Sequence, residues 1–360
     1  MTSPPRAAAP KRGMTVHALG TGGGPIVSAS RAGTSTAVVV DGAAYLIDAG
    51  MGSIRNYRSH CSWAQLRAVL LTHHHSDHLY DLGAYLVTGW EVPGESFSRP
   101  VRVLGPGRAA LKRGRTTTGT ADIVEALLGT VFSSDIAVRR EDEGRGDPRA
   151  WILAEDITVP GGAGTDESTR HPELEPFEVY RDELVTITAT LADHRLCYPA
   201  FAFRVDSAYG SVVISGDTAP SANVERLSEG ADLLLHEVID LDSILATFPD
   251  GPSRAGIEVH LRESHTPYSE VGKVAANAGV HGLVLHHIVP NTPGAADLDA
   301  ILVGARADFA GPVAIAEDND VFSVGQPPGP EGGGTHDGVH RLERGAVPGV
   351  VRAELAGSLA

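Results

Sequence analysis

The chain has 360 residues, which is long enough for one large domain or two ordinary ones with a sizeable core. Its 45 acidic residues against 29 Lys and Arg give a net charge of −16, which argues against broad attraction to a nucleic-acid backbone or an anionic membrane. Only Cys61 and Cys197 carry thiols, so neither a disulfide framework nor a paired-cysteine zinc site is indicated.

The beginning of the chain, MTSPPRAAAPKRG, carries charge and proline but lacks the apolar centre of a signal peptide. Nowhere do about 18 apolar residues follow one another, as a membrane-spanning helix requires. We therefore expect a protein of the reducing cytoplasm that makes no use of a membrane.

Short stretches rich in β-branched residues recur along the chain and predict strands. In chain order they are MTVHALG, STAVVV, AAYLID, LRAVLLT, VRVLG, LVTITATLA, AFAFRV, GSVVISGD, ADLLLHE and GLVLHH. Helical stretches lie between several of them, namely 81–90, 120–132, 221–230 and 269–279. In the last helix Ser269 is placed as the N-cap and Gly279 as the C-cap. This α/β mixture favours two sheets packed face to face with helices outside, although periodicity alone does not fix the order of the layers.

Composition divides the chain into three parts. Residues 1–13 are rich in Pro and Ala and predict a disordered N-terminal tail, and residues 326–360 predict a flexible C-terminal tail. The folded part is then 14–325. Within it, residues from about 135–183 contain fourteen acidic side chains and six arginines. This composition indicates a solvated acidic insertion around one strand, AWILAEDITV, at residues 150–159, and the insertion is either a lid over a site or a variable surface loop.

The stretch LTHHHSDHLYDLG, residues 71–83, places four histidines and two aspartates behind the apolar run LRAVLL. In an extended segment side chains alternate, so His73 and His75 point one way while His74 points the other. Asp77 and His78 follow where the chain turns into a helix, and the turn can bring them to a second cation beside the first. A surface loop has no reason to specify so many ligands at this spacing, so His-x-His-x-Asp-His predicts a metal site.

This motif resembles the fingerprint of the metallo-β-lactamase superfamily, and the similarity extends from AAYLIDAG to GLVLHHIVP. The resemblance implies a four-layer αββα sandwich and further ligands at later strand ends: His194 in LADHR, Asp217 in VVISGDTAPS and His287 in LVLHHIVPN. Of the adjacent pair His286 and His287, the second occupies the position of the family's histidine.

The resemblance implies a site for two cations. The expected ligands of the first are His73, His75 and His194, those of the second are Asp77, His78 and His287, and the Asp217 carboxylate bridges the two. Mixed histidine and carboxylate ligation suits two Zn²⁺, with Mn²⁺ or iron as alternatives. Asp48, in YLIDAG, is expected to orient a ligand histidine, and the alternative is an aspartate that serves only the strand-end turn.

Glu237 in LLLHEVID and His265 in ESHTPYSE indicate which branch of the superfamily the chain resembles. They resemble tRNase Z and the related zinc arylsulfatases, in which a His-Glu pair supports a histidine that is not a ligand. On this resemblance Glu237 orients His265, and His265 donates a proton or hydrogen bond to the transition state, while Asp77 also aligns the nucleophile. The stretches HEVID and CYPAFAFRV are more similar to the arylsulfatase-like members.

We therefore expect a binuclear zinc hydrolase that uses a metal-bridging hydroxide to cleave a phosphodiester or aryl sulfate ester of a small anionic molecule. The alternative is a tRNA 3′-processing endoribonuclease, which the negative net charge disfavours. It is also disfavoured because the nearest basic run, GRAALKRGR, is too short for the arm by which tRNase Z grips tRNA. Lactone or thioester hydrolysis and a catalytically silent scaffold are further alternatives. The resemblance also implies a homodimer.

Overall fold

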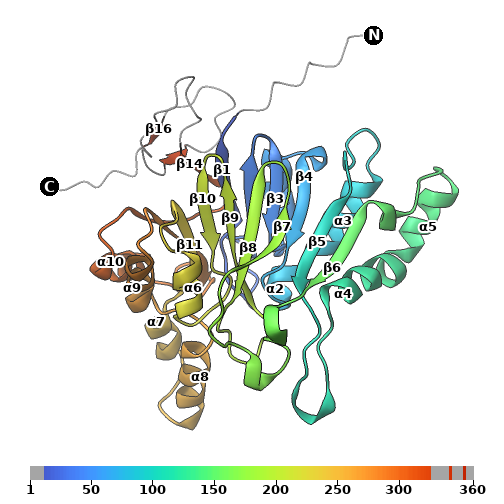
Figure 1. The fold of residues 1–360 in the computed structure, drawn as a ribbon. Helices are drawn as coiled ribbons and strands as arrows, with labels where there is room; N and C mark the ends of the chain where they lie inside the picture. Colours follow the sequence, from blue (N-terminus) through green and yellow to red (C-terminus); the bar gives the residue numbers. More distant parts are fainter. Residues whose placement is uncertain (1–11, 326–339, 343–351, 354–360) are drawn as a thin grey trace.

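The computed structural model of the chain describes residues 12–325, 340–342 and 352–353. Most of the predicted N-terminal and C-terminal tails lies outside these residues. Two sheets pack face to face and carry helices on their outer faces (Figure 1). The four-layer αββα sandwich expected from the sequence is thereby confirmed.

The first sheet has nine strands within the described residues, in the order β16-β15-β14-β1-β2-β3-β4-β5-β6. Their bounds are β1 (Met14–Gly20), β2 (Ser35–Val40), β3 (Ala43–Ile47), β4 (Leu66–Leu70), β5 (Val101–Pro106), β6 (Ile152–Ile157), β14 (Asp320–Val324), β15 (His340–Leu342) and β16 (Arg352–Ala353). Strands β3 to β6 run parallel to one another, while β1 pairs antiparallel with both β2 and β14. The two short strands β15 and β16 belong to the stretch predicted as a tail and extend the sheet beyond β14.

The second sheet has seven strands within the described residues, in the order β13-β12-β11-β10-β9-β8-β7. Their bounds are β7 (Phe177–Arg181), β8 (Val185–Leu191), β9 (Phe201–Ser207), β10 (Gly210–Ile214), β11 (Leu233–Ile239), β12 (Leu283–Val289) and β13 (Val313–Ile315). Strands β10 to β13 run parallel, and β7 to β10 run antiparallel. The parallel strands of each sheet bring their carboxyl ends to one edge of the sandwich, where the histidine motif lies.

Strand β3 shows how the layers separate. Tyr45 and Ile47 belong to the core between the sheets, whereas Ala44 and Leu46 belong to the core between the first sheet and its helices. Because successive side chains point to opposite faces, a strand covered on both sides is apolar throughout. All five residues of β3 are buried. The continuous apolar runs in the sequence therefore mark strands in the middle of the sandwich.

Helices cover the two outer faces of the sandwich. Those on the first sheet are α1 (Ser53–His60), α2 (Ser76–Leu79), α3 (Leu82–Glu91), α4 (Thr120–Ala126) and α5 (Ser133–Glu141), and the later ones are α6 (Ala222–Leu227), α7 (Leu241–Ala246), α8 (Pro252–Arg262), α9 (Tyr268–Ala278) and α10 (Leu298–Asp308). A third cluster of buried residues joins α6, α9 and α10 to the second sheet. None of the helices in the described part of the chain is long and apolar enough to cross a membrane.

All four helices expected from the sequence are found, although 120–132 divides into α4 and a π-helical turn at Leu127–Val131. The C-cap at Gly279 is confirmed, because this residue has a left-handed φ of 61°. The N-cap at Ser269 is wrong. Helix α9 already begins at Tyr268, and Pro267 stands before it with the extended backbone of an N-cap residue.

The acidic stretch from about 135–183 is part of the sandwich rather than an addition to it. It supplies α5 and two strands, and β6 and β7 form edges of the first and the second sheet. Glu155 and Glu178 lie on these exposed edges, where they pair with Arg102 and Arg181. Charged side chains at a sheet edge discourage pairing with other chains. Most of the other acidic residues of the stretch lie in α5 and in the loops, so the stretch combines edge strands, a helix and solvated loops.

Candidate metal centre

The histidine motif starts at the carboxyl end of β4, where Asp48 anchors it. Thr72 donates to both carboxylate oxygens of Asp48, from its backbone N–H to Oδ1 and from its hydroxyl to Oδ2, at 2.8 Å each. Asp48 has a left-handed φ of 60° directly after β3. Asp48 therefore turns the chain at the end of β3, and it also holds Thr72, which follows β4.

The side chains of the motif diverge as the alternation of an extended segment predicts. His73 and His75 lie together, with ring centroids 4.7 Å apart, and His74 turns away so that its Nε2 lies 2.9 Å from the Thr120 hydroxyl. Helix α2 begins directly after His75 and carries Asp77 and His78. One short helical turn is thus enough to bring these two groups back to the same site.

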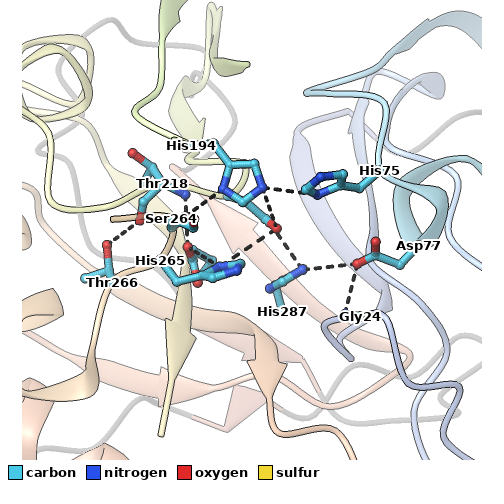
Figure 2. A network of polar contacts seen from close by, with 12 residues as sticks. Gly24, His75, Asp77, His194, Thr218, Ser264, His265, Thr266 and His287 are labelled. Carbon is cyan, nitrogen blue, oxygen red and sulfur yellow. Dashed lines mark hydrogen bonds and ion pairs between the residues drawn. The ribbon is translucent and has the colours of Figure 1, made fainter. Parts of the chain in front are cut away.

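Potential ligand atoms gather in five overlapping groups, and the atoms of each group lie within 4.8 Å of one another. Three of these groups include Asp217, His265 or Glu237, and the other two are called here the first and the second ligand group. The first consists of His73, His75 and His194, joined by Cys197, and the second consists of Asp77, His78 and His287. Figure 2 shows His75, His194, His287 and Asp77 pointing toward one another from different elements. The sets are the ones expected from the sequence, apart from the added thiol.

His287 reaches the cluster because β12 is irregular at this residue. The pairing of β11 with β12 shifts by one residue here, so Glu237 pairs with His286 and Val238 with Ile288. His287 is left over and has a left-handed φ of 48°. A bulge of this kind re-aims a side chain. His286 is buried but belongs to neither group.

The two oxygens of Asp217 face different groups. Oδ1 lies 3.4 Å from Nε2 of His78 and 3.2 Å from Nε2 of His287. Oδ2 lies 3.8 Å from Nε2 of His73 and 3.9 Å from Nε2 of His194. The carboxylate therefore stands between the two groups with one oxygen turned toward each, which is the arrangement that a bridging ligand requires.

These residues fit divalent cations. Nε2 of His73, His78 and His287 and Oδ1 of Asp217 are buried, and none has a hydrogen-bond partner among the described residues. Buried polar atoms without a partner are costly, which points to something that they bind. Two ligand atoms on a tetrahedral Zn²⁺ at about 2.1 Å lie roughly 3.4 Å apart, close to the nitrogen–oxygen separations around Asp217.

Other contacts fix the orientation of the imidazoles. Nδ1 of His78 donates to Oδ2 of Asp48 at 2.8 Å, and Nδ1 of His194 donates to the backbone oxygen of Ser264 at 2.7 Å. In both residues the second nitrogen, Nε2, is thereby presented to the cluster as an acceptor. Asp48 thus contacts a histidine in the way expected from the sequence, in addition to its part in the turn.

The protonation states also suit metal binding. Burial lowers the pKa of His194 to about 3 and holds the pKa of His73 well below its usual value, so both rings are neutral. Burial opposes ionisation of Asp217, but the charges of His287 and His78 bring the pKa of this carboxyl well below its usual value. The pKa of His78 is correspondingly raised against the effect of burial, chiefly by Asp217 and Asp48. Cations would replace protons held between these groups.

His265 and Glu237 form a pair beside the cluster. Nδ1 of His265 donates to Oε1 of the fully buried Glu237 at 3.0 Å, and the same oxygen accepts from the backbone N–H of Thr218 at 2.9 Å. Burial would lower the pKa of His265, but the charge and hydrogen bond of Glu237, with Asp217, raise this pKa to about 9. The side chain of His265 keeps 14% of its surface exposed, so a substrate can reach it.

The glycine loop that follows β1 also contacts two of the expected ligands, and it resembles the Gly-rich passage that runs under the site in the tRNase Z-like branch. The backbone N–H of Gly24 donates to Oδ2 of Asp77 at 2.9 Å, and a Cβ on Gly23 would lie 2.7 Å from the ring of His287. The run TGGGP has the spacing of no phosphate-binding fingerprint, so in the sequence alone it is weak evidence for a site, and its contacts with Asp77 and His287 are known only from the structure.

Comparison with known proteins places the chain in a class. The family model described as "Metallo-beta-lactamase superfamily" matches residues 30–254. The metallo-β-lactamase fold protein YhfI from Bacillus subtilis has a similar fold, with a TM-score of 0.56 and 20% identity, over 86% of this chain and 98% of that one. The short form of human tRNase Z superposes with a TM-score of 0.52 and 19% identity, over 85% of this chain and 98% of that one. The chain belongs to the metallo-β-lactamase superfamily.

Relatives of higher identity fall in one branch. The chain is 33% identical over 307 residues to a protein named Ribonuclease Z from Mycobacterium bovis, covering 85% of this chain and 96% of that one. It is 34% identical over 295 residues to a Ribonuclease Z from Mycolicibacterium gilvum, covering 81% and 91%. The tRNase Z-like branch is therefore supported, and the chain is a metal-dependent hydrolase by membership of the superfamily.

Proposed function

We propose that the chain is a metal-dependent phosphodiesterase of the ribonuclease Z type, which cleaves the 3′ extension from a tRNA precursor. The observation that carries the proposal is the His265–Glu237 pair beside two ligand groups, in a chain 33% identical to a Ribonuclease Z over 96% of that protein's length. These relatives favour RNA over the aryl sulfate or other small ester that the sequence alone favoured.

The proposed ligands are the seven side chains of the cluster. His73, His75 and His194 would hold one Zn²⁺, Asp77, His78 and His287 the other, and Asp217 would contact both, with Mn²⁺ or iron as alternatives. When bound, such cations supply Lewis acidity and a water-derived nucleophile at neutral pH.

The chain's own groups would handle the leaving group. Glu237 can only accept at Oε1, so it keeps a proton on Nδ1 of His265 and fixes the plane of the ring. The other ring nitrogen then stands ready to give a proton to the departing oxygen, which requires a group that is protonated at neutral pH. Asp77, held by Gly24, would align the nucleophile on the opposite side of the cluster.

A small anionic ester is the second candidate substrate, and the net charge of −16 favours it. The local charge disfavours binding of RNA less than the net charge of the whole chain does. Between β5 and α4 the exposed guanidinium groups of Arg113 and Arg115 form no ion pair among the described residues, whereas the neighbouring Lys112 pairs with Glu167. Two unpaired arginines can contact one or two phosphates of an RNA.

The experiment is a panel of four substrates for the zinc-loaded chain: a tRNA precursor with a 3′ extension, bis(p-nitrophenyl) phosphate, p-nitrophenyl sulfate and a lactone. We expect cleavage of the precursor at one position, slower hydrolysis of the diester and no turnover of the sulfate. Rapid hydrolysis of sulfate or lactone with an intact precursor would contradict the ribonuclease proposal.

A further inference from the structure

A pocket of about 440 Å³ opens directly beside the first ligand group, because His75 and His194 form part of its wall. Much of the rest of the wall comes from three places in the sequence. Pro106 ends β5 and Leu111 follows it, Ile123 lies in α4, and the segment after His194 supplies Leu196, Tyr198 and Pro199. The lining also includes Leu79, His260 and Ser264. We call this pocket the ring pocket.

The walls of the ring pocket are tied to one another. The Tyr198 hydroxyl donates to the backbone oxygen of Ala110 at 2.9 Å, which joins the segment after His194 to the loop after β5. The Thr120 hydroxyl donates to the backbone oxygen of Pro106 at 3.0 Å and can then accept from Nε2–H of His74. His74, the one histidine of the motif outside both ligand groups, thus holds a wall of the pocket. The pocket is therefore formed in advance of a ligand.

Among the residues that the structure describes, no Asp, Glu, Lys or Arg lines the ring pocket. A second pocket, on the side of Asp77, is lined by Arg31, Arg55, Asp77 and Asp318. The two sides of the cluster consequently differ in character, and an anionic substrate would place its charge at the cluster and an uncharged, apolar group in the ring pocket. Leu196, at the rim, is 54% exposed, which leaves an apolar surface open to such a group.

The shapes of the lining residues favour a flat group. Pro106, Pro199 and Tyr198 present planar or near-planar faces, as do the imidazoles of His75 and His194, and such faces stack on aromatic rings. The hydroxyls of Thr117 and Thr118 also belong to the lining, where they can hydrogen-bond to heteroatoms at a ring edge.

We propose that the ring pocket binds an aromatic ring carried by one of the groups esterified to the scissile phosphate, and that this ring is a nucleobase in an RNA substrate. The inference rests on the proposed phosphodiesterase function and names the part of the substrate that lies next to His75 and His194. A ring held there fixes the phosphate at the cluster, because ring and phosphate belong to one nucleotide.

The test compares Leu111→Ser and Leu196→Ser with the wild type, each loaded with zinc. The matched control is Leu153→Ser, which changes a leucine that is 41% exposed on edge strand β6 and absent from the pocket lining. The substrates are a dinucleoside monophosphate, its two abasic analogues that each lack one base, and methyl p-nitrophenyl phosphate. Bound zinc is measured for every variant, because unchanged zinc shows that the fold and cluster are retained.

For the wild type we expect kcat/KM to be about tenfold higher with both bases present than with one abasic position, and the analogue that loses this advantage identifies the base that enters the pocket. In both pocket variants the advantage should shrink toward onefold, and in Leu153→Ser it should persist. If only methyl p-nitrophenyl phosphate is affected, the ring is an aryl group and the assignment to a nucleobase is wrong. Equal values for all proteins on all substrates would overturn the ring pocket.

Binding of adenosine to the zinc-loaded chain separates this inference from the proposed function, because it requires no turnover. Adenosine should bind the wild type and Leu153→Ser and bind both pocket variants about tenfold more weakly. Such binding without hydrolysis of any diester would support the ring pocket and contradict the phosphodiesterase. Hydrolysis of diesters without binding of adenosine and without any advantage of a base would support the phosphodiesterase and contradict the ring pocket.

Discussion

Single residues decide whether the ligands of the cluster can reach their positions, and Gly24 is the clearest case. Its N–H holds one oxygen of Asp77, and a Cβ built on it would overlap the carboxylate of the same aspartate. The absence of a side chain at this residue is therefore a requirement of the site. Groups that hold a metal ligand in place typically contribute ten- to hundredfold to metal affinity.

Gly24→Ala should accordingly displace Asp77 and raise the Kd of the more weakly held zinc by about ten- to hundredfold. The matched control is Gly146→Ala, because a Cβ there would meet nothing within 4 Å and the backbone needs no left-handed φ. Competition with a chromogenic chelator measures both constants. If Gly24→Ala and Gly146→Ala bound zinc equally, Asp77 would not depend on the glycine loop.

His265→Ala should keep both cations and lose turnover, because in the proposed site this ring donates a proton and binds no metal. Loss of a general acid lowers kcat by about 10² to 10⁴, whereas loss of a ligand, as in His73→Ala, should lower bound metal as well. Elemental analysis together with kcat separates the two cases. If His265→Ala kept the wild-type kcat, or if it lost zinc, the assignment of His265 as a proton donor that binds no metal would be refuted.

His236 lies outside the ligand sets, and it provides a test of how the stability of the chain depends on pH. It is fully buried, and burial lowers its pKa below the usual value of 6.5. A histidine with a lowered pKa in the folded state binds its proton more readily in the unfolded chain, so stability falls as pH drops below about 6.5. At pH 5.5 wild type should therefore lose more stability than His236→Gln, relative to pH 7.5, by at most about 1.4 kcal/mol. Urea unfolding of the two proteins at both pH values measures this difference, and parallel losses would contradict it.

The sequence predicts which side chains gather in the cluster, but it does not predict most of the contacts that support them. The spacing of His73, His75, Asp77 and His78 follows from the alternation of a strand and one helical turn, so local geometry is enough. His194, Asp217 and His287 are far apart in the sequence, and only the resemblance to a family connected them. The contacts of Gly24 and Ser264 arise from loops that meet in space, for which no local pattern exists.

At the scale of elements, α9 and α10 approach each other closely enough for one glycine to matter. A Cβ on Gly272 of α9 would overlap the backbone oxygen of Ala305 in α10. Alanine is the better helix former by about 1 kcal/mol, but a backbone atom of a packed helix cannot move aside cheaply. The packing therefore outweighs the intrinsic preference at this residue.

Gly272→Ala should destabilise the chain by about 1–3 kcal/mol in spite of its higher helix propensity. Gly256→Ala in α8 is the control, because nothing lies within 4 Å of its Cβ, and it should stabilise by about 0.5–1 kcal/mol. Denaturant unfolding compares the two variants. The same sign of effect for both would show that the contact between α9 and α10 does not limit stability.

Element prediction succeeded in the middle of the sandwich and was incomplete at its edges, where β6 was predicted but β7 and β13 were not. Strand β3 is buried on both sides and was recognisable as an apolar run, whereas β7 has only one fully buried residue among charged ones and was taken for part of a loop. Strand β13 has three residues, too few for any period to show. Of the acidic stretch from about 135–183, strand β6 was predicted, whereas α5 and β7 were not, since an exposed edge strand can have the composition of a surface loop.

At the scale of the whole molecule, the two sheets serve to bring distant strand ends together. The ligands come from the ends of β4, β8, β10 and β12, which belong to both sheets, so the cluster forms only when the sandwich closes. Cations bound to such a site add their binding free energy to the stability of the fold. The metal-free chain should therefore unfold at a lower temperature than the loaded chain.

The central claim is that the cluster binds two cations on either side of Asp217, and diffraction at the zinc absorption edge from crystals of the loaded chain tests it most directly. Two anomalous peaks are expected, one among His73, His75 and His194 and one among Asp77, His78 and His287, each about 2.1 Å from a different oxygen of Asp217. Elemental analysis of the same protein should give two zinc ions per chain. A cluster without an anomalous peak in excess zinc, or a fully active chain without metal, would contradict the account.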